Sequence, residues 1–208
     1  MMFLQESGFD AKYILDIGVA TGTPWISDIF PSATHILIEP DLKYNETIQR
    51  NYENLNYELI NIALGAASSE TADIKIVKSE IAASGEYLNG RTEYIFASVV
   101  ALDDLKLTPS GHSIIKIDVD GYDIDVLHGG KNTIPKFDVL IIESKLKDIH
   151  KTISTVPDCF ELWDIVNLSY GYGHLGEVDL VFKHNQLELE QPQGFIKNQP
   201  FRQGAEIL

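Results

Sequence analysis

The sequence of 208 residues predicts an α/β fold, in which a doubly wound, mostly parallel sheet ends in an antiparallel hairpin. Short apolar segments alternate with helical segments along most of the chain, and this alternation is typical of parallel sheets with helices on both faces. Residues 12–18 form an apolar strand that passes through a glycine-containing loop into a helix expected over 24–30. Apolar segments at 160–168 and 177–182 flank a short glycine-rich stretch and predict the closing hairpin.

The composition argues against several classes of partner. A net charge of −15 would repel the phosphate backbone of a nucleic acid, and there is no basic segment that an anionic membrane would attract. No apolar run approaches the roughly 18 residues needed to span a membrane, and the first residues lack the pattern of a signal peptide. Cys159 is the single cysteine, so no internal disulfide can form. We therefore expect a soluble, cytoplasmic protein that binds neither nucleic acid nor membranes.

The loop after the first strand predicts a nucleotide-type site. Gly18 permits a tight turn, and Gly22 permits close approach of the backbone to a ligand. The helix expected over 24–30 would present its first backbone N–H groups to the same loop. Glycine turns after strands are common, so the loop alone is weak evidence for a nucleotide site. The strand that follows it adds to this evidence.

That next strand, predicted over 35–39, ends in an acidic side chain. Glu39 follows the start of the glycine loop by about 20 residues, and an acid at this distance is placed to accept hydrogen bonds from ribose hydroxyls. The alternative is that Glu39 caps the following helix, although Asp41 is better placed for that role. We therefore favour ribose binding by Glu39, with Pro40 beside the base.

A third strand is predicted over 57–64. At its end, the stretch from Asn61 to Ala63 would pass near the far end of a nucleotide. The segment 65–100 contains two stretches of alternating polar and apolar residues. This pattern predicts a β insertion in the same domain.

The apolar strand over 114–119 is the most informative stretch, because it carries a lysine and leads into acids. Lys116 lies on a side of the strand that is otherwise apolar, and a buried ammonium group needs an anionic partner. Asp118, two residues further on the same side, is the nearest candidate. Asp120 follows at the carboxyl end of the strand, where ligands bind in open α/β sheets. The alternative is an ion pair plus a helix cap, but several acids at one strand end favour a site.

The elements after this strand add a further acid. A helix expected over 121–130 is closed by two glycines, and an apolar strand over 137–143 ends in Glu143. If the two strands are neighbours, Glu143 lies beside Asp118. A helix to about residue 155 follows.

The C-terminal part suggests a loop and a tail. The aromatic, glycine-rich stretch 170–176 contains His174 and would line a substrate pocket or, equally, form an ordinary hairpin turn. We predict a single domain over 1–184. Residues 185–208 are polar with scattered proline and glycine, which predicts a tail or an arm that packs on a second subunit of a homodimer.

The glycine loop has the pattern Gly-x-x-x-Gly instead of Gly-x-Gly-x-x-Gly, which argues against a nicotinamide dinucleotide. Parallel strands followed by an antiparallel hairpin resemble the class I methyltransferases, which use S-adenosylmethionine (AdoMet). Within this class the chain resembles the FkbM-like methyltransferases. The stretches that carry the resemblance are Leu15 to Gly22, Ile38-Glu39-Pro40, Leu102-Asp103-Asp104-Leu105, Ile115 to Gly129 and, more weakly, Glu177 to Phe182.

The resemblance implies a seven-stranded Rossmann-like sheet, AdoMet as cofactor and O-methylation, often of hydroxyls on sugars or natural products. The residues implied to surround the cofactor, from its methionine part through the ribose to the adenine, are Asp16, Gly18, Gly22, Asp118, Glu39, Pro40, Asn61 and Ala63. The chain departs from the family pattern at Val19-Ala20, where Ala-Asn is usual, and at Asp120 and Asp123, where glutamate is usual.

Methyl transfer to a hydroxyl requires a base that takes its proton. The candidates are Asp118 and Asp120, with His174 as a third, and Lys116 would hold Asp118 and Glu143 in their ionised forms. In an alternative, Asp118, Asp120 and Glu143 bind Mg²⁺ or Ca²⁺, and the metal ion acidifies the hydroxyl. The ammonium group of Lys116 argues against this alternative, because it would occupy the same acidic cluster.

Two other functions are compatible with the sequence. Gly18 and Glu39 would also suit a nicotinamide-dependent oxidoreductase. The departures in the loop and at Asp120 and Asp123 would also suit a binding protein that kept the fold and lost the chemistry.

Overall fold

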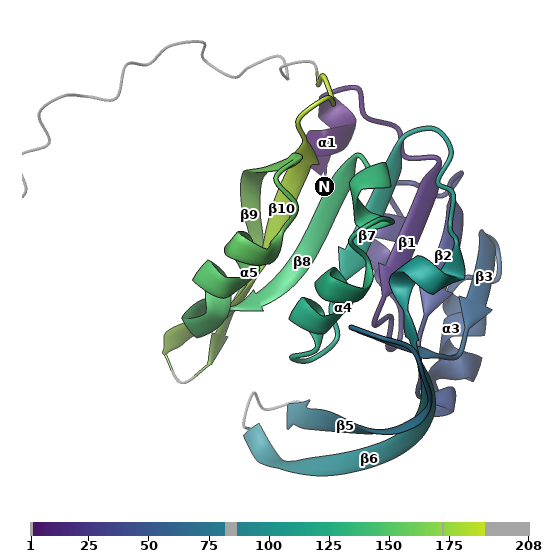
Figure 1. Cartoon of the computed structure of the whole chain (residues 1–208), viewed down its shortest axis with the longest axis vertical. Helices are drawn as coiled ribbons and strands as arrows, with labels where there is room; N and C mark the ends of the chain where they lie inside the picture. Colours follow the sequence, from purple (N-terminus) through teal and green to yellow (C-terminus); the bar gives the residue numbers. More distant parts are fainter. Residues whose placement is uncertain (1, 82–86, 172, 190–208) are drawn as a thin grey trace, which may run out of the picture.

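The computed structural model describes residues 2–81, 87–171 and 173–189. The main strands are β1 (Tyr13–Ile17), β2 (Thr34–Ile38), β3 (Asn56–Ile60), β7 (Ser113–Ile117), β8 (Val139–Lys145), β9 (Phe160–Gly171) and β10 (His174–His184). They form one sheet in the order β3-β2-β1-β7-β8-β10-β9 (Figure 1). Neighbours from β3 to β8 run parallel, whereas β10 is antiparallel to both β8 and β9. The predicted seven-stranded, mostly parallel sheet with a terminal hairpin is confirmed.

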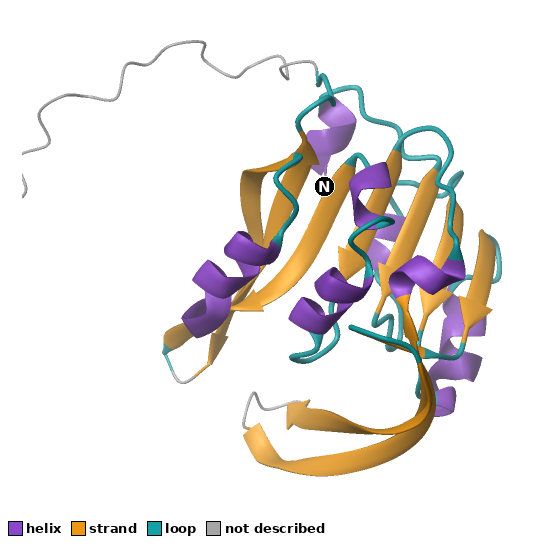
Figure 2. Cartoon of the chain, viewed as in Figure 1, coloured by secondary structure: helices purple, strands orange, loops and turns teal. Residues whose placement is uncertain are grey.

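Helices cover both faces of this sheet (Figure 2). The α-helices are α1 (Met2–Glu6), α2 (Pro24–Ser27), α3 (Asn45–Asn51), α4 (Asp123–Gly129) and α5 (Ile149–Thr155), and the 3₁₀ helices are η1 (Leu42–Tyr44), η2 (Leu102–Leu105), η3 (Ile134–Lys136) and η4 (Leu146–Asp148). On one face, Val126 of α4 belongs to a core cluster with Ile115. On the other, Leu4 of α1 and Ile26 of α2 belong to a cluster with Ile14. The sheet is therefore doubly wound, as predicted.

The segment predicted as one strand over 57–64 is two strands in different sheets, which corrects that prediction. After β3 the chain turns, and the N–H of Ile62 donates to the carbonyl of Ile60 at 3.1 Å. It then enters a three-stranded sheet made of β4 (Ala63–Gly65), β5 (Ser69–Ile81) and β6 (Tyr87–Ala101). The apolar pattern continues through the turn, so the change of direction is invisible in the sequence.

The insertion predicted within 65–100 contains β5 and most of β6, which pair antiparallel with Ile74 opposite Ile95. Figure 1 shows both strands beyond the edge of the main sheet to which the parallel strands point. The insertion is tied to α4 at a close contact. A Cβ on Gly129 would lie 2.1 Å from the carbonyl oxygen of Gly65, so only glycine allows this approach.

Asp103, within a stretch that carries the family resemblance, has a structural role. Its Oδ1 accepts hydrogen bonds from the N–H groups of Asn132 at 3.1 Å and Thr133 at 2.8 Å. Burial would raise the pKa of Asp103, but these hydrogen bonds outweigh it and hold the pKa below its ordinary value. Asp103 therefore fastens η2 to the turn that follows α4.

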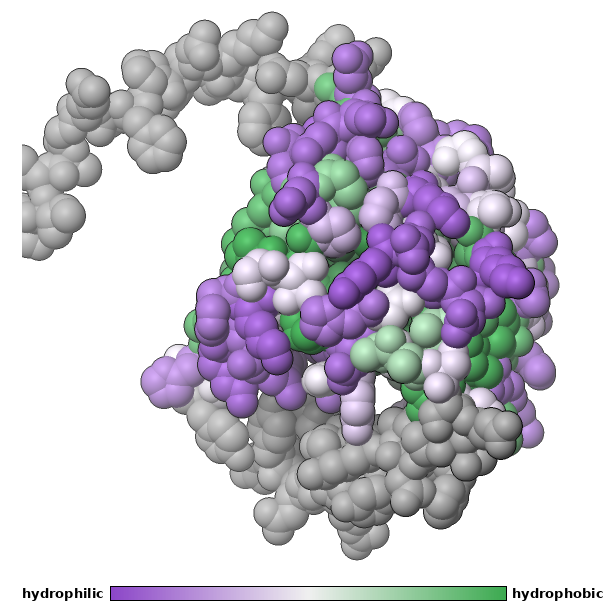
Figure 3. Space-filling view, viewed as in Figure 1, coloured by the Kyte–Doolittle hydropathy of each residue, from purple (hydrophilic) through white to green (hydrophobic). Residues whose placement is uncertain are grey.

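The outer strand β9 exposes large apolar side chains, namely Leu162, Ile165, Leu168 and Tyr170. Figure 3 shows hydrophobic atoms in this part of the surface, over the hairpin and next to α5. Most of the predicted tail, 190–208, lies outside the described residues, so the arm and its second subunit remain predictions. None of the helices in the described ranges has the length and apolar composition that a membrane-crossing segment requires.

Candidate active site

One face of the main sheet changes from apolar to polar toward the carboxyl ends of its parallel strands. The first half of this face carries core side chains, including Ile14 and Ile114. Two residues further along the same strands, the same face carries Asp16 and Lys116, which are direct neighbours across β1 and β7. The polar side chains that continue this face are, in order across the sheet, Asp16, Lys116, Asp118, Glu143 and Asp179, which we call the polar row.

Members of the polar row form one side of a cavity of about 680 Å³. The glycine loop after β1, the tip of β2, the strand β4 and Val99 of β6 also line it. This volume is within the range of about 300–1,000 Å³ that is usual for small-molecule sites. The cavity lies beyond the carboxyl ends of the parallel strands, where open α/β sheets bind ligands.

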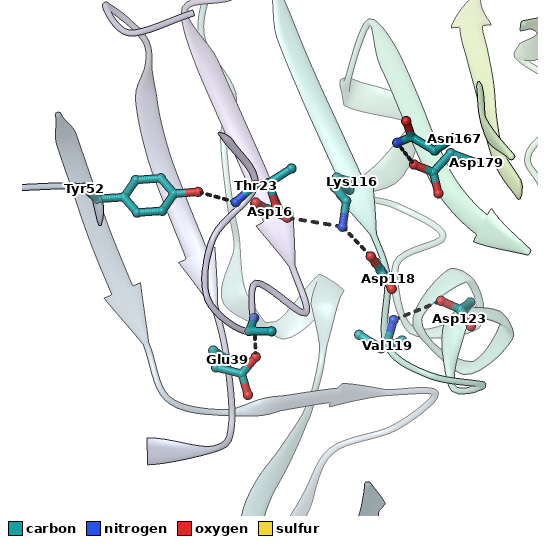
Figure 4. A network of polar contacts seen from close by, with 11 residues as sticks. Asp16, Thr23, Glu39, Tyr52, Lys116, Asp118, Val119, Asp123, Asn167 and Asp179 are labelled. Atoms are coloured by element: carbon teal, nitrogen blue, oxygen red, sulfur yellow. Dashed lines mark hydrogen bonds and ion pairs between the residues drawn. The ribbon is translucent and has the colours of Figure 1, made fainter. Parts of the chain in front are cut away.

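Lys116 lies between two carboxylates of the polar row (Figure 4). Its side chain is 4% exposed, and its Nζ lies 2.8 Å from Asp118 Oδ2 and 3.9 Å from Asp16 Oδ1. Burial favours the neutral amine, but the two carboxylates outweigh it and raise the pKa of Lys116. The predicted pairing with Asp118 is confirmed, and Asp16 is a second partner that the sequence did not suggest.

Asp16 itself lies behind the cavity wall. It is 2% exposed and is not among the residues that line the cavity. Burial raises its pKa, and the ammonium group of Lys116 offsets part of this effect. Apart from that ammonium group, Oδ1 finds no hydrogen-bond partner within the described part of the chain. Asp16 therefore acts on the cavity through Lys116.

Glu143 and Asp179 are direct neighbours across β8 and β10. Like charges in this relation repel each other. Burial, followed by the negative charge of Asp118 and other acids, raises the pKa of Glu143 to about 8. Glu143 therefore holds its proton more tightly than an ordinary glutamate does. This corrects the expectation that Lys116 keeps Glu143 ionised, because the ammonium group is turned toward Asp118.

The glycine loop is shaped by close contacts. Gly18 has φ +82°, and a Cβ there would lie 1.7 Å from the carbonyl oxygen of Asp118. Gly22 has φ +121° and faces the ring of Tyr52. The hydroxyl of Tyr52 accepts a hydrogen bond from the N–H of Thr23 at 3.1 Å, and burial is the main cause that raises the pKa of Tyr52 to about 12. Tyr52 thus supports the loop, a role that the sequence did not reveal.

Glu39 fastens the same loop from the tip of β2. Its side chain is buried, and its oxygens accept hydrogen bonds from the N–H groups of Ala20 and Asp41, both at 2.8 Å. Burial raises its pKa, partly offset by these bonds. Glu39 and Asp41 share the capping of the helix that follows β2. Glu39 accepts from the N–H of Asp41, and Oδ1 of Asp41 accepts from the N–H of Lys43 at 3.2 Å. Glu39 also lines the cavity, and a carboxylate oxygen that accepts one hydrogen bond can accept a second.

The other predicted cofactor residues near Glu39 divide into two groups. Pro40 and Ala63 line the cavity. Asn61 does not: its Nδ2 donates to the carbonyl of Glu39 at 2.8 Å, and its side chain exchanges hydrogen bonds with Asn45. Asn61 therefore supports the tip of β2 from outside the cavity.

The loop between β7 and α4 places Asp118 and Asp120 on the cavity wall. Asp120 has φ +51°, and burial together with the charge of Asp118 raises its pKa. Asp123 holds this loop in shape, because its two oxygens accept from the N–H groups of Val119 at 3.1 Å and Gly121 at 3.2 Å. The two acidic positions among the departures from the family pattern thus differ in role, since Asp120 lines the cavity and Asp123 is bonded to the loop.

The terminal hairpin contributes two residues that sequence reasoning missed. Asn167 and Asp179 line the cavity, and Nδ2 of Asn167 donates to Oδ2 of Asp179 at 2.6 Å. Asp179 is a charged residue in an apolar strand, the same signal that identified Lys116. His174 lies at the start of β10, is exposed and is not among the cavity residues. The structure therefore brings Asp179, but not His174, to the other candidate acids.

The metal alternative can be compared with this geometry. Among the residues that the structure describes, no group of three or more His, Cys, Asp or Glu side chains is arranged to hold a metal ion. The proposed set of Asp118, Asp120 and Glu143 is therefore not supported by the arrangement. Lys116 contacts Asp118 where a metal ion would compete with it.

Similar folds occur in solved methyltransferase structures. The N-methyltransferase NodS from Bradyrhizobium japonicum WM9 has a TM-score of 0.52 and 9% identity, covering 88% of this chain and 92% of that chain. Fibrillarin from Aeropyrum pernix in complex with natively bound S-adenosyl-L-methionine has a TM-score of 0.52 and 15% identity, covering 84% and 67%. An rRNA methylase from Streptococcus thermophilus has a TM-score of 0.51 and 9% identity, covering 88% and 92%. At these identities the likeness shows the fold alone.

No curated protein matches the sequence. The family model of the methyltransferase FkbM domain matches residues 16–172, well over half of the chain. The match begins in β1 and runs through the glycine loop and the polar strand β7 into the terminal hairpin. The resemblance predicted from the sequence is confirmed, and the chain belongs to the FkbM family of methyltransferases.

Proposed function

We propose that the chain transfers a methyl group from AdoMet to a hydroxyl group of a small molecule or sugar. The family and the class I fold support AdoMet as the methyl donor, the cofactor expected from the sequence. Transfer to oxygen is our own inference. The observation that carries it is Glu143, a cavity carboxyl group whose pKa of about 8 suits it to take a proton from a hydroxyl.

The cavity residues fit this cofactor. Gly18 allows the backbone of the loop to run close to Asp118, and the loop residues from Gly18 to Thr23 line the space that a ligand would fill. Glu39 has lone pairs left for ribose hydroxyls after its two backbone bonds. When bound, AdoMet supplies a reactive methyl group on a positively charged sulfonium, and the excess of acids in the polar row favours such a charge.

Within the polar row we assign different tasks to the acids. Asp118 is held by Lys116 at 2.8 Å, which makes it an anchoring hydrogen-bond acceptor. Within the described part of the chain no ammonium group forms an ion pair with Glu143, and Glu143 is the stronger base when it is ionised, because its pKa is raised. We therefore propose Glu143 as the general base, with Asp118 and Asp120 orienting the acceptor hydroxyl. Orientation of this kind can supply several kcal/mol of the barrier reduction.

The pH dependence of the rate tests the role of Glu143. Below its pKa the carboxyl group is protonated and cannot accept a proton, so the rate should fall by about tenfold for each pH unit well below the midpoint. Without ligand the midpoint is about 8, and the positive charge of the cofactor will move it lower. Methyl transfer from labelled AdoMet, measured from pH 5.5 to 9, should show this decrease of the rate toward low pH in the wild type.

The variant Glu143→Gln should no longer show this fall of the rate at low pH, and its kcat should be at least about 100-fold lower than that of the wild type. Glu161→Gln is the matched control, because Glu161 lies on β9 with a 58% exposed side chain paired to Lys183. An unchanged pH profile in Glu143→Gln would show that another group is the base.

Calorimetric titration with S-adenosylhomocysteine and, separately, with NAD tests the cofactor site. We expect binding of the first and none of the second. Glu39→Ala should weaken binding by roughly 10- to 150-fold, which corresponds to the loss of hydrogen bonds to a charged group. Glu58→Ala, on the exposed surface of β3, should bind as the wild type does. Binding of NAD alone would favour the oxidoreductase, and binding of neither ligand would favour a non-catalytic protein.

A further inference from the structure

The glycine loop contains a turn with an unfavourable residue. The N–H of Gly22 donates to the carbonyl of Val19 at 2.8 Å, which closes a four-residue turn. Ala20, the first central residue of this turn, has φ +48°, in the left-handed region. Turns with a positive φ at that position are dominated by glycine, asparagine and aspartate. A Cβ disfavours the left-handed conformation by about five- to thirtyfold in population, so Ala20 requires support from outside the turn.

This support comes largely from the end of α3. Asn51, the last residue of the helix, donates from Nδ2 to the carbonyl of Thr21 at 2.6 Å. Tyr52 follows, and its hydroxyl accepts from the N–H of Thr23 at 3.1 Å (Figure 4). Between these two bonds lies Gly22, where a Cβ would be 3.1 Å from the ring of Tyr52. The tip of β2 binds the loop as well, so the segment from β2 to α3 is hydrogen-bonded to the loop at three points.

Asn51 differs from Tyr52 in its surroundings. Tyr52 is 2% exposed and belongs to a core cluster, so its removal would disturb the fold itself. Asn51 is exposed and is not among the residues that line the cavity. Thr21, whose carbonyl accepts from Asn51, does line the cavity. Asn51 is therefore a surface residue whose hydrogen bond reaches the wall of the cofactor site from outside.

We infer that Asn51 is a positioning residue for the cofactor. It holds the turn in the left-handed form that Ala20 resists, and so gives the loop the shape that binds AdoMet before the cofactor arrives. Ordering the loop in advance favours binding, because the cofactor does not have to supply the ordering. Without the bond, only a fraction of the molecules has the competent loop, and the apparent affinity falls by that fraction. The inference rests on AdoMet as the methyl donor of the proposed function and is independent of the methyl acceptor.

Calorimetric titration with S-adenosylhomocysteine tests the inference in a double-mutant cycle. Asn51→Ala should weaken binding by about five- to tenfold, which corresponds to the loss of one hydrogen bond. In the Ala20→Gly background the same change should weaken binding by less than about twofold, because glycine adopts a positive φ at no steric cost. The midpoint of urea denaturation of the ligand-free Asn51→Ala protein should stay close to that of the wild type, because the released turn relaxes to a form in which Ala20 is not left-handed.

Asn54→Ala is the matched control. Asn54 is also exposed and lies three residues further along the chain, and its amide donates to Glu53 at 3.4 Å. This variant should bind S-adenosylhomocysteine as the wild type does.

Three results would overturn the role of Asn51 alone. The first is unchanged affinity in Asn51→Ala. The second is an equal loss of affinity in both backgrounds, because Asn51 would then not act through Ala20. The third is a loss of stability as large as the loss of affinity, which would make Asn51 a merely structural residue. If the wild type itself does not bind S-adenosylhomocysteine, the proposed function is wrong as well.

Discussion

Replacing Lys116 with methionine is expected to lower the free energy of unfolding by about 3–5 kcal/mol, as measured by urea denaturation at pH 7. The side chain is 4% exposed, so methionine fills much of the same space. The cost arises from Asp16, which is 2% exposed and would keep a buried negative charge without its ammonium partner. Removing one member of a buried ion pair is costly for this reason.

The loss in Lys116→Met should depend on pH in a defined direction. Burial already raises the pKa of Asp16, and without Lys116 the main opposing effect disappears. A raised pKa means that the folded state binds the proton more tightly than the unfolded state. Stability of the variant should therefore be higher at acidic pH and should fall as the pH rises above the unfolded pKa of Asp16.

Two further variants make this prediction specific. Lys183→Met removes an ion pair whose partner, Glu161, is 58% exposed, and a hydrogen bond to the carbonyl of Leu187 at 3.1 Å, and should cost less than about 2 kcal/mol. The double variant Asp16→Asn, Lys116→Met removes the uncompensated charge and should recover most of the loss. Equal losses for Lys116→Met and Lys183→Met would contradict the role assigned to the buried pair.

The second large effect is expected for Gly18→Ala, with a loss on the order of 4–5 kcal/mol in stability. A Cβ would lie 1.7 Å from the carbonyl oxygen of Asp118, which is backbone and has no rotamer to change. The φ of +82° adds strain of about 1–2 kcal/mol for a residue with a side chain. The backbone must move to relieve this clash, and the movement would displace the glycine loop. Affinity for S-adenosylhomocysteine should therefore also fall by about 100-fold or more.

Gly121→Ala separates the effect of the clash with Asp118 from the effect of the positive φ. Gly121 has φ +100°, but nothing lies within 4 Å of the position of its Cβ. Its substitution should therefore cost the backbone strain alone, about 1–2 kcal/mol. Thermal denaturation of both variants provides the comparison. If Gly18→Ala is no worse than Gly121→Ala, the close approach to Asp118 is not what requires glycine.

The polar row could be predicted in part from the sequence, for a simple physical reason. A charged residue in an apolar strand needs a partner or a ligand, so Lys116 and Asp118 attract attention without any structure. Asp179 carries the same signal in β10. The partner across the sheet could not be predicted, because the pairing of Asp16 with Lys116 depends on the order and register of the strands.

Other features depend on geometry that hydrophobic patterns do not encode. The division of 57–64 into β3 and β4 requires a turn with no sequence signal, and it moves Ala63 into another sheet at the cavity wall. The position of Asn167 depends on a bulge between β9 and β10, which is a property of two paired strands and not of either one alone. The raised pKa of Glu143 could not be predicted for a similar reason, since the acids around it come from several elements.

The place of β10 in the sheet has a consequence for synthesis of the chain. β10 is the last strand of the described residues, yet it lies between β8 and β9. While the ribosome is still adding residues 174–184, β8 has no partner on one side, and its Val-Leu-Ile-Ile core presents open backbone groups. Unpaired apolar edges of this kind promote aggregation of incomplete chains. Completion of the hairpin therefore closes this edge and, in the same step, delivers Asp179 to the cavity.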